Sequence, residues 1–177
     1  MSKDWIALMR ELGSDFATRA ADHDAHDSFV GENYARLREN DAFAAGVPSE
    51  LGGGGASHEV LCGMIRELAR HCGSTALAFS MHTHLVGTLA YAWRAGNKMP
   101  EGMLRRVASE KLILVSNGGS DWLPGSGKLE KVAGGFRFTA RKLFRSGVPS
   151  GDILMTTGGF NDPHDRPTVD HFPLPVK

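Results

Sequence analysis

The sequence has little cysteine, no excess of either charge and no long apolar run, and each of these absences excludes a class of protein. Two of its 177 residues are cysteines, too few for the disulfide framework of a small secreted domain. If Cys62 and Cys72 lie on one helix, about 15 Å separates their Cα atoms, well beyond the roughly 4.4 to 6.8 Å of a disulfide. We therefore expect two free, buried thiols.

Acidic and basic side chains are equally frequent, with 20 of each. Without a basic field, the chain has nothing to hold a phosphate polymer or an anionic membrane surface, so nucleic acid is not an expected partner. No run approaches the roughly 20 apolar residues of a membrane span, and the first residues lack the apolar core of a signal peptide. We therefore expect a cytoplasmic protein without a membrane span.

Apolar residues recur at spacings of three and four along most of the first 111 residues, which is the pattern of helices with one buried face. A polar break is expected at residues 22–27, and glycines and prolines favour an irregular crossing at residues 43–51. The predicted helices lie around residues 5–16, 34–37, 58–71, 76–93 and 101–110. The helix at 76–93 carries little charge, so we expect it to be central and covered on most sides.

After residue 111 the pattern changes to short apolar runs separated by turns, including a two-residue Gly134-Gly135 turn. The predicted strands lie at residues 112–115, 129–133, 136–144 and 153–157, with at best an edge strand at 169–172 among prolines. At 177 residues the chain is long enough for one large domain or two small ones. The sequence therefore predicts an α+β fold: an N-terminal all-α helical domain (residues 1–111) followed by a partial antiparallel β-barrel domain (residues 112–177).

The segment Ile113–Asp121 is a short apolar strand that opens into a loop of small residues, where glycines let backbone amides approach a ligand. The predicted strand at residues 136–144 ends in an aromatic ring, and Ser146 and Gly147 follow it. A planar, electron-accepting ring with a phosphate tail needs a face to stack on, donors for its edge and bare backbone near its charges. This combination indicates a flavin site.

Three segments resemble the acyl-CoA dehydrogenase family, in the same order along the chain. Val47–Gly53 is similar to the family's loop of Val-Pro, an acidic residue and paired glycines. Ser116–Asp121 is similar to its strand-end signature, and Lys142–Gly147 to the strand that lies against the flavin. The resemblance implies an N-terminal helical domain, a middle β domain and a C-terminal four-helix domain, with FAD between the last two. This chain holds only the first two.

By this resemblance, Ser116 bonds the pyrimidine edge of the flavin, Phe144 lies along the ring system, and Ser146 places a hydroxyl near the reactive nitrogen. The implied cofactor is FAD, with FMN as the alternative, and no metal is implied. The implied cofactor-binding residues are Leu114, Ser116, Asn117, Phe144, Arg145 and Ser146. The implied substrate-binding residues are Ser120, Met81 and His82.

The family oxidises the α,β bond of an acyl thioester such as an acyl-CoA in fatty acid metabolism, and a glutamate of its C-terminal domain is the general base. No residue of this chain can take that role, so we predict no catalytic residue and expect the chain alone to be inactive. The family's Glu-Pro is missing after Ser116, and Phe144, Arg145 and Ser146 replace a Trp, an apolar residue and a Thr. Two alternatives therefore stay open: a flavin-dependent monooxygenase of the same fold, and an inactive assembly or interaction module.

Two pairs of histidines are candidates for a metal site, and neither pair is expected to form one. His23 and His26 lie among aspartates, but short polar residues between helices commonly cap chain ends. His82 and His84 point about 200° apart on a helix, so they cannot share a metal, and one of them is expected to line a pocket.

A β domain that ends near Lys177 leaves strand edges and an apolar helix face without partners, so we expect a homo-oligomer, either a dimer or a tetramer.

Overall fold

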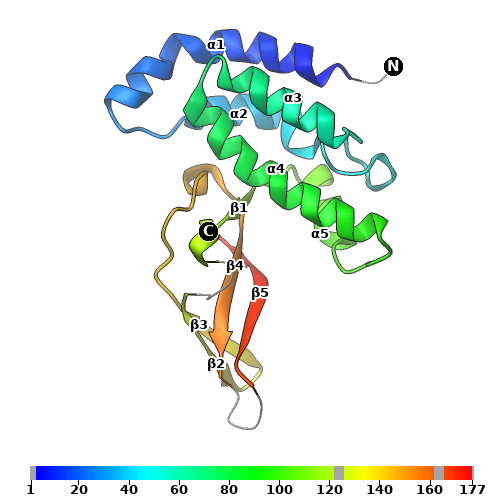
Figure 1. Cartoon of the computed structure of the whole chain (residues 1–177), viewed down its shortest axis with the longest axis vertical. Helices are drawn as coiled ribbons and strands as arrows, with labels where there is room; N and C mark the ends of the chain where they lie inside the picture. The colour runs from blue at the N-terminus through cyan, green and yellow to red at the C-terminus, as the bar shows by residue number, and fades with distance from the viewer. Residues whose placement is uncertain (1–2, 122–125, 162–165, 177) are drawn as a thin grey trace.

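The computed structural model describes residues 3–121, 126–161 and 166–176, and it consists of a group of helices followed by a sheet (Figure 1). The helices gather at one end of the molecule, and the sheet extends from α4 towards the other end. The helices are α1 (Trp5–Ala25), α2 (Gly31–Glu39), α3 (His58–Ala69), α4 (Gly73–Arg94) and α5 (Glu101–Ser109). The strands are β1 (Leu114–Ser116), β2 (Lys128–Val132), β3 (Gly135–Thr139), β4 (Ile153–Phe160) and β5 (Thr168–Pro175).

The first helix begins where the sequence predicts it and continues further. Asp4 caps α1, because its side chain accepts a hydrogen bond from the backbone N–H of Ala7 at 2.9 Å. The helix continues to Ala25, so the polar segment 22–27 does not break it at residue 22. The reason is that His23 is buried and bonds Ser28 at 2.7 Å, which gives the last turn its own contacts.

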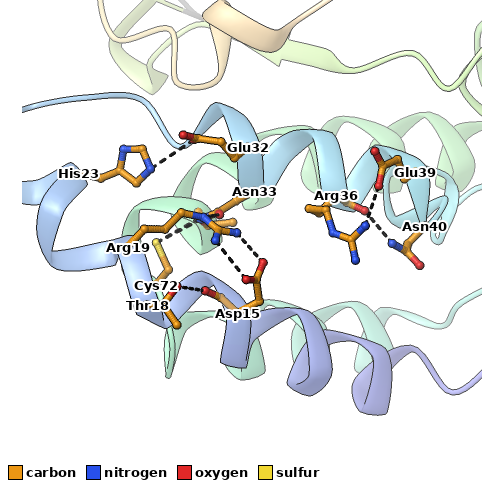
Figure 2. A network of polar contacts seen from close by, with 11 residues as sticks. Asp15, Thr18, Arg19, His23, Glu32, Asn33, Arg36, Glu39, Asn40 and Cys72 are labelled. Carbon is orange, nitrogen blue, oxygen red and sulfur yellow. Dashed lines mark hydrogen bonds and ion pairs between the residues drawn. The ribbon is translucent and has the colours of Figure 1, made fainter.

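Polar side chains join α1 to α2 (Figure 2), and a hydrogen bond from Asn33 joins α2 to the start of α4. Arg19 pairs with Asp15 at 2.6 Å and donates to the amide oxygen of Asn33 at 2.7 Å. Asn33 in turn donates to Thr75 at 2.7 Å, and His23 lies 3.3 Å from a carboxylate oxygen of Glu32. Within the described ranges, no three His, Cys, Asp or Glu side chains gather in a way that could hold a metal ion.

Helix α4 contributes to two hydrophobic cores. Phe79 lies in the first core, among side chains of α1, α2 and α3. Leu85 and Val86 lie in the second core, together with apolar residues of α5, β1 and β4. The prediction of a central helix is therefore confirmed on these faces, but one face is uncovered, because Leu77 and Tyr91 are 61% and 76% exposed.

The sheet is open and mixed. In the described residues β4 is its spine: β1 and β2 pair with β4 in parallel, whereas β5 pairs with it antiparallel. The β2–β3 hairpin is antiparallel. The α+β class is confirmed. The antiparallel expectation holds for two of these four pairings, β2–β3 and β4–β5. The other two are parallel because the β2–β3 hairpin lies between β1 and β4 along the chain, and β4 then runs in the direction of β1.

Two strand boundaries differ from the prediction. Strand β3 ends at Thr139 and does not reach Phe144. Phe144 has a φ of 54°, a left-handed conformation that a strand cannot contain. Strand β5 is longer than expected and pairs with β4 from Thr168 to Pro175. Its prolines are tolerated because proline is compatible with a sheet edge.

Both cysteines are free thiols, as predicted. The expectation that both are buried is wrong for Cys62, which is exposed on α3, and right for Cys72, which precedes α4. Among the described residues, no helix combines the length and apolar character that crossing a bilayer requires.

Candidate functional site

The end of β1 lies against α4 and β4. Ser116 is buried, and its hydroxyl oxygen is 3.8 Å from the sulfur of Met81 on α4. The side chain of Asn117 donates to the hydroxyl of Thr156 on β4 at 2.8 Å. The residues Ser116–Gly118, called the strand-end segment below, are thus fixed between a helix and the spine of the sheet.

The loop after β3 approaches this segment. It is called the returning loop below and comprises Lys142–Gly147. A Cβ atom built on Gly118 would lie 3.1 Å from the Cβ of Phe144, so the absence of a side chain at Gly118 lets the two segments come this close. The structure therefore brings together the two regions that the sequence predicts as a flavin site, although the second is a loop and not a strand.

Phe144 has two unusual properties for a large aromatic residue. Its side chain is 79% exposed, and its backbone is in the left-handed region at a φ of 54°. Such a conformation is unfavourable for a bulky residue, and strained positions of this kind concentrate at ligand sites. Arg145 is exposed and Ser146 is half-buried beside it. An exposed ring flanked by a guanidinium and a hydroxyl fits the edge and face of a flavin.

A buried ion pair joins the returning loop to the residues after β1. The ammonium group of Lys142 is 2.8 Å from the carboxylate of Asp121, in η3 (Gly119–Asp121). Burial raises the pKa of Asp121, but hydrogen bonds from Lys142 and Ser126 outweigh this, and the net shift is downward. Both residues lie in segments that resemble the family, but the sequence does not predict a role for either of them, because only the fold brings them together.

His82 and Leu114 serve the fold. His82 is 1% exposed; its Nδ1 accepts the N–H of Leu114 at 2.9 Å, and its Nε2 donates to the carbonyl of Phe43 at 2.8 Å. Burial lowers the pKa of His82 to about 4, so the ring is neutral. With both nitrogens engaged, His82 links the helices to β1 and has no group left for a substrate.

Two cavities meet at the uncovered face of α4. One, of about 360 Å³, lies between α4 and strands β4 and β5, and the other, of about 520 Å³, lies between α3 and α4. His84 and Thr88 line both of them, and Met81 lines the second. Thr156, the partner of Asn117, lines the first. These contacts connect the strand-end segment to a largely apolar groove.

The structure thus sorts the predicted site residues. Met81 lines the second cavity, and Phe144 is exposed in the returning loop. Ser116 and Asn117 are buried in the strand-end segment, and Leu114 and His82 are buried as well. The expectation that one histidine of the 82/84 pair lines a pocket corresponds to His84. The side chain of Ser120 lies outside the described part of the structure.

The chain is similar to known proteins that have different named activities. The sequence model of the family described as acyl-CoA dehydrogenase, N-terminal domain, matches residues 6–111. The dibenzothiophene monooxygenase of Mycolicibacterium goodii is 27% identical over 162 residues, which are 88% of this chain and 38% of that protein. The mitochondrial isovaleryl-CoA dehydrogenase of Arabidopsis thaliana is 29% identical over 113 residues, which are 62% of this chain and 28% of that protein.

A solved structure shares the fold. The complex of TdsC from Paenibacillus sp. A11-2 with FMN and indole matches with a TM-score of 0.83 at 18% identity, covering 98% of this chain and 43% of that chain. The chain therefore spans less than half the length of each of these three proteins.

Proposed function

Because the chain belongs to the acyl-CoA dehydrogenase family, we propose that it forms the flavin-binding part of an oxidoreductase. The proposed flavin contacts are Ser116 and Asn117 in the strand-end segment, and Phe144, Arg145 and Ser146 in the returning loop. The exposed ring of Phe144 supports this assignment, because a flavin stacked on it would remove a large apolar surface from water. FMN is the first cofactor to test, with FAD as the second.

Among the reactions of this fold, we propose a monooxygenase that acts on an uncharged aromatic compound. The observation that carries this choice is the lining of the two cavities, in which no Lys or Arg stands among the described residues. An acyl-CoA carries several phosphate charges, which proteins normally pair with Lys, Arg or backbone amides. A largely apolar groove whose polar side chains are hydroxyls, imidazoles and one thiol suits a neutral ring better.

Acyl thioester dehydrogenation is the second candidate. The isovaleryl-CoA dehydrogenase relative supports it, as does the match to the family's N-terminal domain. In either reaction Met81 is the proposed substrate contact from α4, and Ser120 stays a prediction.

A bound flavin would carry the electrons: as a reduced flavin it would donate two electrons to O₂, so that one oxygen atom enters the substrate and the other leaves as water, whereas in a dehydrogenase the oxidised flavin would accept a hydride from the substrate. The residues of this chain would bind and orient. Phe144 would support one face of the ring, Ser146 would donate a hydrogen bond to its edge, and the apolar cavities would exclude water from the substrate.

The test has two parts. The protein is first titrated with FMN and FAD while flavin fluorescence is followed. The complete oxidoreductase, of which this chain is proposed to form the flavin-binding part, is then supplied with enzymatically reduced FMN, ¹⁸O₂ and indole, and one ¹⁸O atom in the product by mass spectrometry is the expected result. Bleaching of bound flavin by isovaleryl-CoA, without oxygen incorporation, would favour the dehydrogenase. Failure of an intact fold to bind either flavin would favour an assembly or interaction module.

A further inference from the structure

The buried ion pair between Lys142 and Asp121 connects the returning loop to the residues after β1. The two side chains are 3% and 10% exposed, and the ammonium nitrogen is 2.8 Å from the carboxylate. The same nitrogen donates to the carbonyl of Thr157 at 2.7 Å and to the carbonyl of Ser126. A lysine ammonium has three donors. Two carbonyls accept from this one, and its charge is paired with the Oδ2 of Asp121, which has no other hydrogen-bond partner among the described residues.

The acidic partner is itself held from several sides. One carboxylate oxygen of Asp121 accepts the N–H of Ser126 at 2.7 Å, and the carbonyl of Asp121 accepts the hydroxyl of Thr157 at 2.7 Å. Earlier in the same stretch, Asn117 bonds Thr156. The chain between residues 117 and 121 is therefore fastened to β4 near both of its ends, and Lys142 ties the returning loop to this fixed stretch.

We propose that Lys142 is a positioning residue: its ion pair with Asp121 sets the distance at which the strand-end segment and the returning loop face one flavin. This inference rests on the proposed flavin site. Phe144 follows Lys142 by two positions and closely approaches Gly118, because a Cβ atom built on Gly118 would lie 3.1 Å from the Cβ of Phe144. Because its nitrogen is buried, bonded to two carbonyls and paired with Asp121, Lys142 acts through the loop and not by touching the cofactor.

The experiment compares variants of the full chain. Lys142→Met alone leaves a buried carboxylate without its partner, which can unfold the protein, so the main variant is the double substitution Asp121→Asn with Lys142→Met, which removes both charges. The control is Lys128→Met, which removes an exposed ammonium paired with Glu130. We expect the dissociation constant for FMN to rise roughly tenfold or more in the double variant, since small displacements of a binding shell are costly, with unchanged circular dichroism. We expect the control to stay within about twofold. Equal FMN affinity in the wild type and the double variant would overturn the proposal.

A second readout needs no flavin. Amide hydrogen exchange is measured on the apoprotein, and we expect faster exchange at residues 116–118 and 144–147 in the double variant, with α4 unchanged. If the strand-end segment keeps its wild-type protection, the proposed coupling is wrong. If the wild type binds neither FMN nor FAD, the proposed function fails, while the exchange result still decides whether Lys142 couples the two segments.

Discussion

The buried imidazole of His82 predicts a specific loss of stability in acid. In the folded chain, Nδ1 accepts the N–H of Leu114 and therefore cannot carry a proton unless that bond breaks. The ring is enclosed between α4, η1 (Ala42–Ala44) and the start of β1, where a charged imidazolium has no water around it. Protonation of His82 should therefore separate the helices from the sheet or require unfolding.

The magnitude follows from the two pKa values. An unfolded histidine binds its proton near pH 6.5, whereas burial lowers the pKa of His82 in the folded state to about 4. Between these values the unfolded chain binds more protons, so the free energy of unfolding decreases as the pH falls from 6.5 to 4. At about 1.4 kcal/mol per pKa unit, the total contribution is about 3 kcal/mol, fully present above pH 6.5 and lost by about pH 4.

The assay is urea unfolding at pH 7.0, 6.0, 5.0 and 4.5, followed by circular dichroism. The test variant is His82→Asn, which does not titrate but keeps an acceptor for Leu114. We expect it to be less stable than the wild type at pH 7 by about 1 to 3 kcal/mol, because the carbonyl of Phe43 loses its donor. Its stability should decrease less steeply in acid, whereas the control His84→Asn, on the exposed face of α4, should keep the wild-type slope. Identical slopes for the wild type and His82→Asn would refute the reasoning.

Three further predictions concern single sites. Phe144→Ser should weaken FMN binding in a fluorescence titration while changing the unfolding free energy by less than about 0.5 kcal/mol, because the ring is 79% exposed. Gly151→Ala should destabilise the fold by about 1 to 3 kcal/mol in urea, since its Cβ would lie 2.2 Å from a methyl carbon of Val115, whereas Gly102→Ala, with nothing within 4 Å, should not. Tyr91→Ser should reduce self-association in sedimentation velocity, because Tyr91 is 76% exposed on the uncovered face of α4; an unchanged distribution would assign any self-association to another surface.

The helices were predictable from the sequence because their signals are local. Trp5, Met9, Leu12 and Phe16 repeat at helical spacing, and all four are buried on one face of α1. The hydroxyl of Ser57 caps α3, as its position before the apolar pattern suggests. The candidate flavin segments could also be proposed from the sequence, because small residues after a strand are visible without knowing the fold.

The prediction of a strand over residues 136–144 is wrong beyond Thr139, because the path of the chain there depends on distant residues. Residues 136–144 carry apolar side chains in a pattern that a strand also produces. The chain leaves the sheet after Thr139 because Lys142 forms an ion pair with Asp121 and a hydrogen bond with the carbonyl of Thr157, which lie 21 and 15 positions away in the sequence. No local sequence pattern predicts a buried ion pair between distant residues, so the end of β3 can be identified only in the folded structure.

The two histidines of α4, by contrast, could have been told apart by helical phase. His82 follows Phe79 by three positions and precedes Val86 by four, so it lies on the stripe that faces the cores. His84 lies seven positions from both Leu77 and Tyr91, on the exposed face that borders the cavities. The same helix therefore joins the two halves of the molecule on one side and lines the candidate substrate groove on the other. It follows that substitutions two residues apart should differ in kind: a change at His82 should appear in unfolding curves and their pH dependence, whereas a change at His84 should appear in substrate binding and leave those curves in place.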